Sequence, residues 1–143
     1  MSNGIKVKKR KGHIEPLNLE KMHVMVEKAC DGLAGVSASQ VEIQSGIQFY
    51  DGITTAEIQE ILIKSANDLI DLDAPNYQFV AARLLLFSIR KSLYGVTDDV
   101  PHLSDHIHKC VDEGVYDSAI FDKYTEEEIN RLQGVIDLSL IHI

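Results

Sequence analysis

The chain has 143 residues, of which 45% are hydrophobic and 25% are charged, and its formal net charge is −8. This length normally makes one domain, the hydrophobic content suits a folded core, and the negative charge argues against unspecific binding to nucleic acid or anionic membranes. No apolar run approaches the roughly 20 residues that span a bilayer. Cys30 and Cys110 lie far apart and are predicted to be reduced thiols. We therefore expect a cytoplasmic protein that binds neither nucleic acid nor membrane.

A β-hairpin is predicted over residues 5–17. It carries a dense group of basic residues, Lys6, Lys8, Lys9, Arg10 and Lys11. Lys11 and Gly12 suit a two-residue turn, which would place Lys8 opposite Glu15. Because like charges so close together repel one another, a basic patch on an acidic protein indicates a bound polyanion. A nucleoside triphosphate fits the size of one hairpin better than a nucleic acid does.

Two helices are predicted after the hairpin. Asn18 is a typical helix N-cap, and an apolar stripe with helical spacing follows it from Leu19 to Leu33. A second helix is expected to begin at Ser37, where Gln40 three residues later completes the pattern of a capping box.

Two more helices are predicted before residue 96. Thr54 and Glu57 form another predicted capping box at the start of the third helix. The fourth helix has Pro75 near its first turn, ends at Gly95 and contains an apolar run over residues 79–87. Because that run is apolar on nearly all sides, we expect this helix to be central and the most buried.

The predicted fold is mainly α (α+β), with a four-helix bundle over residues 1–95 that is capped by a small β-hairpin or sheet. Residues 96–137 follow, with an acidic helix expected over 101–113 and another that Thr125 and Glu128 open with a third capping box. This second part is too short to bury a core of its own. We interpret it as the first few helices of an incomplete domain.

The last six residues, 138–143, differ in character from the helix that precedes them. One back-translation of their sequence, LSLIHI, resembles a transposon end that serves as an adapter in DNA library preparation. We therefore hypothesise an adapter-derived tail on a truncated gene product, and the coding DNA would decide this.

One group of residues suits a bound triphosphate. Lysine and arginine neutralise phosphate oxygens, glutamate and asparagine hydrogen-bond the edge of adenine, and a hydroxyl in the first turn of a helix favours an anion. The candidates are residues 7–12 with Glu15, Asn18, Lys21, Thr55 and Lys91. The alternative is a solvated basic hairpin on a helical bundle, because charge runs are usually solvated faces.

A family resemblance favours the first interpretation. Residues 7–22 read VKKRKGHIEPLNLEKM, and this segment resembles the opening of an ATP-cone domain. Together with segments over 36–70, 73–95 and 105–129, it makes residues 5–137 similar to the N-terminal region of the large (alpha) chain of class I ribonucleoside-diphosphate reductase. The resemblance implies an allosteric switch of overall activity in deoxyribonucleotide biosynthesis, where ATP keeps the enzyme active and dATP turns it off.

The resemblance also implies a set of nucleotide-binding residues. They are Val7, Lys9, Arg10, Glu15, Asn18, Lys21, Thr55, Gln59 and Lys91. Glu15 and Asn18 match adenine recognition, Val7 matches an apolar wall, and the basic residues and Thr55 match triphosphate contacts. Gln59 stands where related sequences often carry a histidine. Glutamine hydrogen-bonds but carries no charge, so the preference between ATP and dATP can differ.

The implied ligand is ATP or dATP as an allosteric effector, with Mg²⁺ on its phosphates. In the parent enzyme, the implied protein partners are the radical-bearing small (beta) subunit and another large chain. The family's catalytic cysteines match neither cysteine of this chain. We therefore expect the chain alone to be inactive as a reductase.

Two other functions and a metal site are weaker interpretations. ATP-cones also occur in a bacterial transcriptional repressor, but that family carries a four-cysteine zinc ribbon and this chain has no CxxC pair. A stand-alone nucleotide-sensing module is the second alternative. Four residues invite a metal interpretation: His102, His106, His108 and Cys110. Helical spacing alone does not make ligands converge on an ion, so we expect no metal site.

Overall fold

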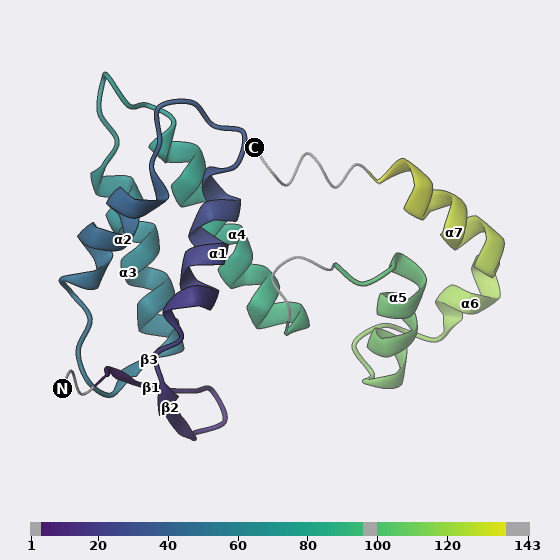
Figure 1. Cartoon of the computed structure of the whole chain (residues 1–143). Coiled ribbons are helices and arrows are strands. Elements are labelled where there is room, and N and C mark those ends of the chain that lie inside the picture. Colours follow the sequence, from purple (N-terminus) through teal and green to yellow (C-terminus); the bar gives the residue numbers. More distant parts are fainter. Residues whose placement is uncertain (1–3, 96–99, 137–143) are drawn as a thin grey trace. The chain divides into compact units, whose positions relative to one another are not determined.

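The structure is a computed structural model that describes residues 4–95 and 100–136. It divides into two compact units, residues 1–89 and 90–143, and each is described by itself. The predicted tail at 138–143 lies outside the described residues. A predicted domain boundary after residue 95 stays a prediction. The mainly helical fold with a small sheet is confirmed (Figure 1).

The first unit contains a three-stranded sheet in the order β2-β1-β3. β1 (Lys6–Lys8) pairs antiparallel with β2 (Ile14–Pro16) and parallel with β3 (Ile53–Thr54). The hairpin is confirmed, and the third strand, which is only two residues long, was not predicted. Its parallel pairing ties the start of the chain to the segment before the third helix.

The hairpin turn differs from the prediction by one residue. The N–H of Lys9 donates to the carbonyl of His13 at 2.9 Å, and the N–H of Gly12 donates to the carbonyl of Lys9 at 2.8 Å. Gly12 has a φ of +86°, so the loop is a three-residue turn that ends in a left-handed glycine. The predicted pairing of Lys8 with Glu15 is therefore wrong, and Val7 lies opposite Glu15 instead.

Four helices of the first unit follow the predicted order. They are α1 (Leu19–Cys30), α2 (Ala38–Gly46), α3 (Thr55–Asp68) and α4 (Tyr77–Tyr94), the last of which continues into the second unit. The amide oxygen of Asn18 accepts the N–H of Lys21 at 2.9 Å, which confirms the predicted cap of α1. The capping box of Thr54 and Glu57 is also confirmed.

The start of α2 is capped by a residue of α4. Ser37 makes no side-chain cap, so the predicted box with Gln40 is wrong. Instead, the N–H of Ser37 donates to the hydroxyl of Tyr77 at 3.0 Å, and that hydroxyl donates to Gln40 Oε1 at 2.9 Å. Since Tyr77 is only 3% exposed, its ring is packed in the core while its hydroxyl holds the loop.

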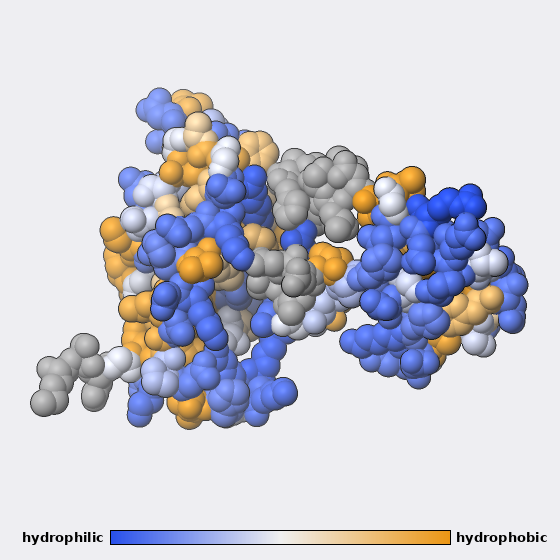
Figure 2. Space-filling model, turned by 45° about the vertical axis from the view of Figure 1, so that its right-hand side comes forward, coloured by the Kyte–Doolittle hydropathy of each residue, from blue (hydrophilic) through white to orange (hydrophobic). Residues whose placement is uncertain are grey.

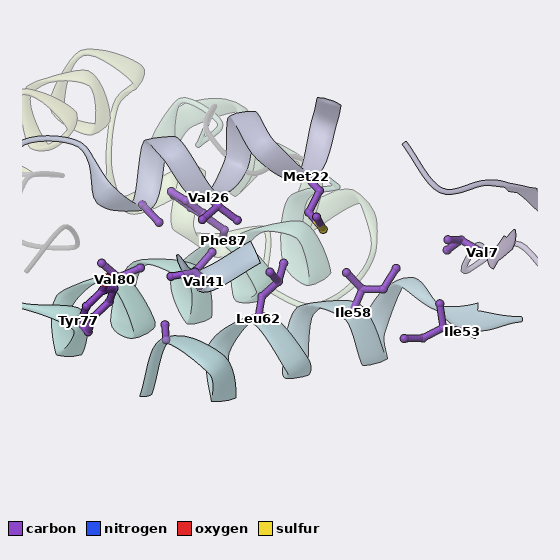
Figure 3. Packing of buried hydrophobic residues seen from close by; sticks show 13 residues of the cluster. Val7, Met22, Val26, Val41, Ile53, Ile58, Leu62, Tyr77, Val80 and Phe87 are labelled. Atoms are coloured by element: carbon purple, nitrogen blue, oxygen red, sulfur yellow. The ribbon is translucent and has the colours of Figure 1, made fainter. Parts of the chain in front are cut away.

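The core of the first unit lies between the sheet and the four helices (Figure 3). Its buried members are Val7, Met22, Val26, Ala29, Val41, Ile53, Ile58, Leu62, Ala66, Tyr77, Val80, Leu84 and Phe87. α4 contributes four of these residues, but Leu85 and Ile89 on the same helix are 48% and 44% exposed. α4 is therefore buried on its inner side and exposed at these two positions, and the prediction that it is the central and most buried helix stays a prediction.

The second unit contains α5 (Leu103–Asp112), α6 (Ala119–Lys123) and α7 (Glu126–Val135). α6 was not predicted, whereas the capping box of Thr125 and Glu128 is confirmed. In the described part of this unit, the buried apolar side chains are Ile107, Cys110 and Ile129. Hydrophilic side chains cover most of its surface in the view of Figure 2. Across residues 4–95 and 100–136, no helix is long and apolar enough to cross a membrane.

Candidate functional site

Three of the predicted site residues share one face of the sheet. Val7 lies opposite Glu15 of β2 and beside Ile53 of β3. Lys9 is the first residue after β1, and its ion pair with Glu15 brings its side chain to the same face. Val7 and Ile53 are 2% and 0% exposed and form the buried part of this face. Lys9 and Glu15 form its more exposed part at the hairpin.

Lys9 and Glu15 form an ion pair on this face. Lys9 Nζ lies 2.7 Å from Glu15 Oε1, and His13 Nε2 lies 3.4 Å from Glu15 Oε2. The hydrogen bond from Lys9 lowers the pKa of the Glu15 carboxyl, and the charges of Lys9 and His13 act in the same direction. Glu15 is therefore an anion at neutral pH and accepts hydrogen bonds.

The start of α1 contributes Asn18 and Lys21. Both side chains are exposed, and they belong to the N-cap and the first turn of the helix. The cap uses the amide oxygen of Asn18. The amide nitrogen of Asn18 can therefore donate to a ligand while the cap stays intact. Lys21 places a positive charge where the N–H groups of the first turn also favour an anion.

The start of α3 contributes Thr55. The parallel register sets Thr54 beside Lys8, so the first turn of α3 begins next to the basic strand. Thr54 is occupied by its capping box with Glu57, and the hydroxyl of Tyr50 donates to Glu57 at 2.8 Å. Thr55 is the first residue of the helix, and its hydroxyl lies outside this cap.

Two helix N-termini lie at the same small sheet. α1 begins shortly after β2, and α3 begins directly after β3 (Figure 1). The N–H groups of a first helical turn lack partners within the helix and carry the positive end of the helix dipole. Combined with the basic side chains of the hairpin, this arrangement suits an anionic ligand.

A side-chain contact of Gln59 connects α3 to α1, one helical turn beyond the site residues Thr55 and Lys21. Its Nε2 lies 3.3 Å from the sulfur of Met25, and its Oε1 is buried without a hydrogen-bond partner in the described residues. Gln59 follows Thr55 by one turn, and Met25 follows Lys21 by one turn. The sequence analysis did not predict this contact of Gln59 with Met25.

Comparison with known proteins identifies the family. The family described as ATP cone domain matches residues 5–92, which include the sheet, α1, α2, α3 and most of α4.

The chain belongs to the ATP-cone family.

Relatives of this ATP-cone chain are alpha subunits of ribonucleoside-diphosphate reductase. It is 48% identical over 137 residues to subunit alpha of reductase 1 from Escherichia coli (strain K12) and, over the same length, to the subunit alpha from Haemophilus influenzae. Each match covers 96% of this chain and 18% of the relative. The subunit alpha from Helicobacter pylori (strain 26695) is 40% identical over 126 residues, which are 88% of this chain and 16% of the relative. The chain thus spans less than a fifth of the length of these relatives.

The remaining predicted residues of the ATP-cone site are Arg10 and Lys91. Arg10 is exposed at the tip of the hairpin. Lys91 lies near the end of α4 in the second unit, so it is not among the residues that the first unit brings together. A contact from Lys91 to a ligand at the hairpin stays a prediction.

Two histidines beyond the ATP-cone match, His106 and His108, lie against aromatic rings. His106 makes edge-on ring contacts with Tyr94 and Tyr116, and its Nε2 lies 3.5 Å from Cys110 Sγ. His108 stacks on Phe121, with ring centroids 4.4 Å apart. Within the two described ranges, the structure has no group of three or more side chains that could hold a metal ion.

Proposed function

We propose that this chain is the allosteric ATP- and dATP-binding region of a ribonucleoside-diphosphate reductase alpha subunit. The nucleotide would lie against the hairpin and the first turns of α1 and α3. The observation that carries this proposal is the sheet register, because it sets Lys9 and Glu15 on one face beside two helix N-termini. Family membership and the relatives' names support it independently.

The ion pair suggests how phosphate and base recognition are coupled. When a triphosphate draws Lys9 away from Glu15, the carboxylate becomes available to accept a hydrogen bond from the amino group of adenine. Guanine carries a carbonyl at the equivalent position, and a carboxylate repels it. We therefore expect ATP and dATP to bind, and GTP to bind much more weakly.

The other site residues would take roles that fit their positions. Arg10 and Lys21 would contact the phosphates, Thr55 would donate its hydroxyl to them, and Asn18 would donate its amide N–H to adenine. Val7 would serve as the apolar wall only through its small exposed part, since it is 2% exposed.

Mg²⁺ would accompany the triphosphate. Among the nine proposed site residues, four are cationic and Glu15 is the one carboxylate. The ion would therefore be held by phosphate oxygens and water, which is how Mg²⁺ commonly binds nucleotides.

In the full-length parent, ATP would sustain activity and dATP would inhibit it, through contacts with the small subunit and another large chain. The relatives match 137 residues, which extend past the ATP-cone match at residue 92, and this favours a reductase over a transcriptional repressor. The two effectors differ by one hydroxyl, so they act only through different affinities for two assembly states.

Calorimetric titration with ATP, dATP and GTP tests the site. Lys9→Ala and Arg10→Ala should each weaken binding of ATP by about 10- to 100-fold, because each removes a charge-assisted hydrogen bond. Lys64→Ala is the matched control. Lys64 is an exposed lysine on α3, about 13 Å along the helix from its first turn, and its loss should leave the affinity unchanged. Unchanged ATP affinity in both hairpin variants would remove the proposed site.

A further inference from the structure

His23 lies between two carboxylates from different helices. Its Nδ1 is 2.6 Å from Oε1 of Glu42 on α2, and its Nε2 is 3.1 Å from Oε1 of Glu27 one turn further along α1. A neutral imidazole has one N–H and can donate to only one of these groups, whereas imidazolium donates to both. The geometry therefore matches the protonated ring.

The charged groups around His23 are acidic. It borders a groove of about 720 Å³ between α1 and α2, which is lined by apolar side chains such as Met22 and Ile43. Besides His23, the charged residues that line this groove are Glu20 and Glu42. The segments that flank the hairpin strands contribute only apolar side chains to it. Further along α1, the thiol of Cys30 stays neutral because burial raises its pKa. The charge of Arg83 on α4 acts on that thiol in the opposite direction to the charges of Glu42 and Glu27.

We propose that His23 is a protonation-dependent clip that holds α2 against α1 and sets the width of the groove beside it. The two ring nitrogens of His23 face carboxylates on separate helices. His23, Glu27 and Glu42 therefore do not converge on a metal cation, and the arrangement instead favours a protonated ring. The clip does not depend on the proposed nucleotide site, which uses other residues of α1.

The hydrogen bond that His23 donates to Glu42, followed by the charge of that carboxylate, raises the pKa of His23. A group whose pKa is higher in the folded state stabilises that state fully below its unfolded pKa, which is about 6.5 for histidine. This stabilisation disappears as the pH rises through the raised pKa. We therefore expect the clip to be closed in mildly acidic solution and to open as the solution becomes alkaline.

An NMR titration of the intact chain tests the protonation and the groove together. The ring ¹⁵N resonances of His23 should give a pKa above about 6.5, and the methyl resonances of Ile43 should move with the same midpoint. The methyl resonances of Ile129, in the second unit, should not follow that midpoint. The proposal would be overturned if the pKa of His23 were unshifted, or if the Ile43 methyl resonances did not change with the protonation of His23.

Thermal unfolding between about pH 6 and 8.5 tests the contribution to stability. The melting temperature of the wild type should fall by several degrees more across this range than that of His23→Gln. Glu42→Gln should remove the same pH dependence. His13→Gln is the matched control, because it removes a more exposed and longer pair at 3.4 Å and should retain the wild-type slope. Parallel curves for the wild type and His23→Gln would contradict the clip.

Discussion

Gly12 determines which hairpin side chains meet. Its φ of +86° lets the loop close over three residues, and this register brings Lys9 and Glu15 to the same face. A slip of one residue would turn every side chain of a strand to the opposite face. The basic hairpin therefore owes its chemical organisation to one backbone conformation as much as to its charges.

Gly12→Ala should destabilise the protein by about 1–2 kcal/mol, because alanine is strained at a left-handed φ even though no atom lies within 4 Å of the added methyl group. Chemical denaturation measures this change. Gly46→Ala is the control, since Gly46 is helical and the space around it is equally open. This substitution should leave the stability of the protein unchanged or raise it by up to about 1 kcal/mol. Equal effects of the two substitutions would show that the turn conformation is not decisive.

At individual positions, the sequence predicted most of the caps but not the partners of the site. Asn18, Thr54 and Thr125 have local signatures, because the groups that they cap lie within three residues. The contact of Gln59 with Met25 joins two helices, so no short pattern could reveal it. The turn was misjudged because two-residue and three-residue loops both end favourably in glycine.

At the level of elements, Tyr77 connects two helices. Its hydroxyl takes the place of a side-chain cap at the start of α2, while its ring belongs to the core from α4. The predicted box of Ser37 and Gln40 fits the local pattern equally well. A buried tyrosine from a distant segment displaced it, which is a tertiary effect that local spacing does not contain.

Tyr77→Phe should lower the free energy of unfolding by about 1–3 kcal/mol, because the N–H of Ser37 loses its acceptor. Tyr50→Phe is the matched control. Tyr50 is 52% exposed and donates to Glu57, so water replaces its bond and the loss should stay below about 1 kcal/mol. Urea denaturation of both variants gives the comparison, and a negligible loss in Tyr77→Phe would refute the capping role.

α4 shows why an apolar run does not specify burial. Val80, Leu84 and Phe87 face the core at helical spacing, but Leu85 and Ile89 lie on the opposite side and are exposed. The run over residues 79–87 contains both faces, so hydrophobicity alone could not tell which side would be covered.

At the level of the whole molecule, the candidate site belongs to the first unit except for Lys91. The order of the four helices and the hairpin could be predicted, because each helix carries its own periodicity and boundary signals. The third strand could not, since two residues carry almost no pattern.

Hydrogen exchange with ATP should protect residues 5–22 and 53–62, which contain the proposed contacts, and leave residues 103–135 unchanged. Ligand binding stabilises the structure that it contacts, and amides that exchange by local opening report this directly. Mass spectrometry resolves these segments. Protection confined to 103–135 would place the nucleotide elsewhere.

The parallel pairing of β1 with β3 has a consequence for biogenesis. β1 and β2 are adjacent in the chain, but β3 follows only after two whole helices. Contacts between such distant segments form late, because the intervening loop must first be closed. During synthesis, the cationic hairpin therefore leaves the ribosome well before β3, the strand that pairs with β1, has been synthesised.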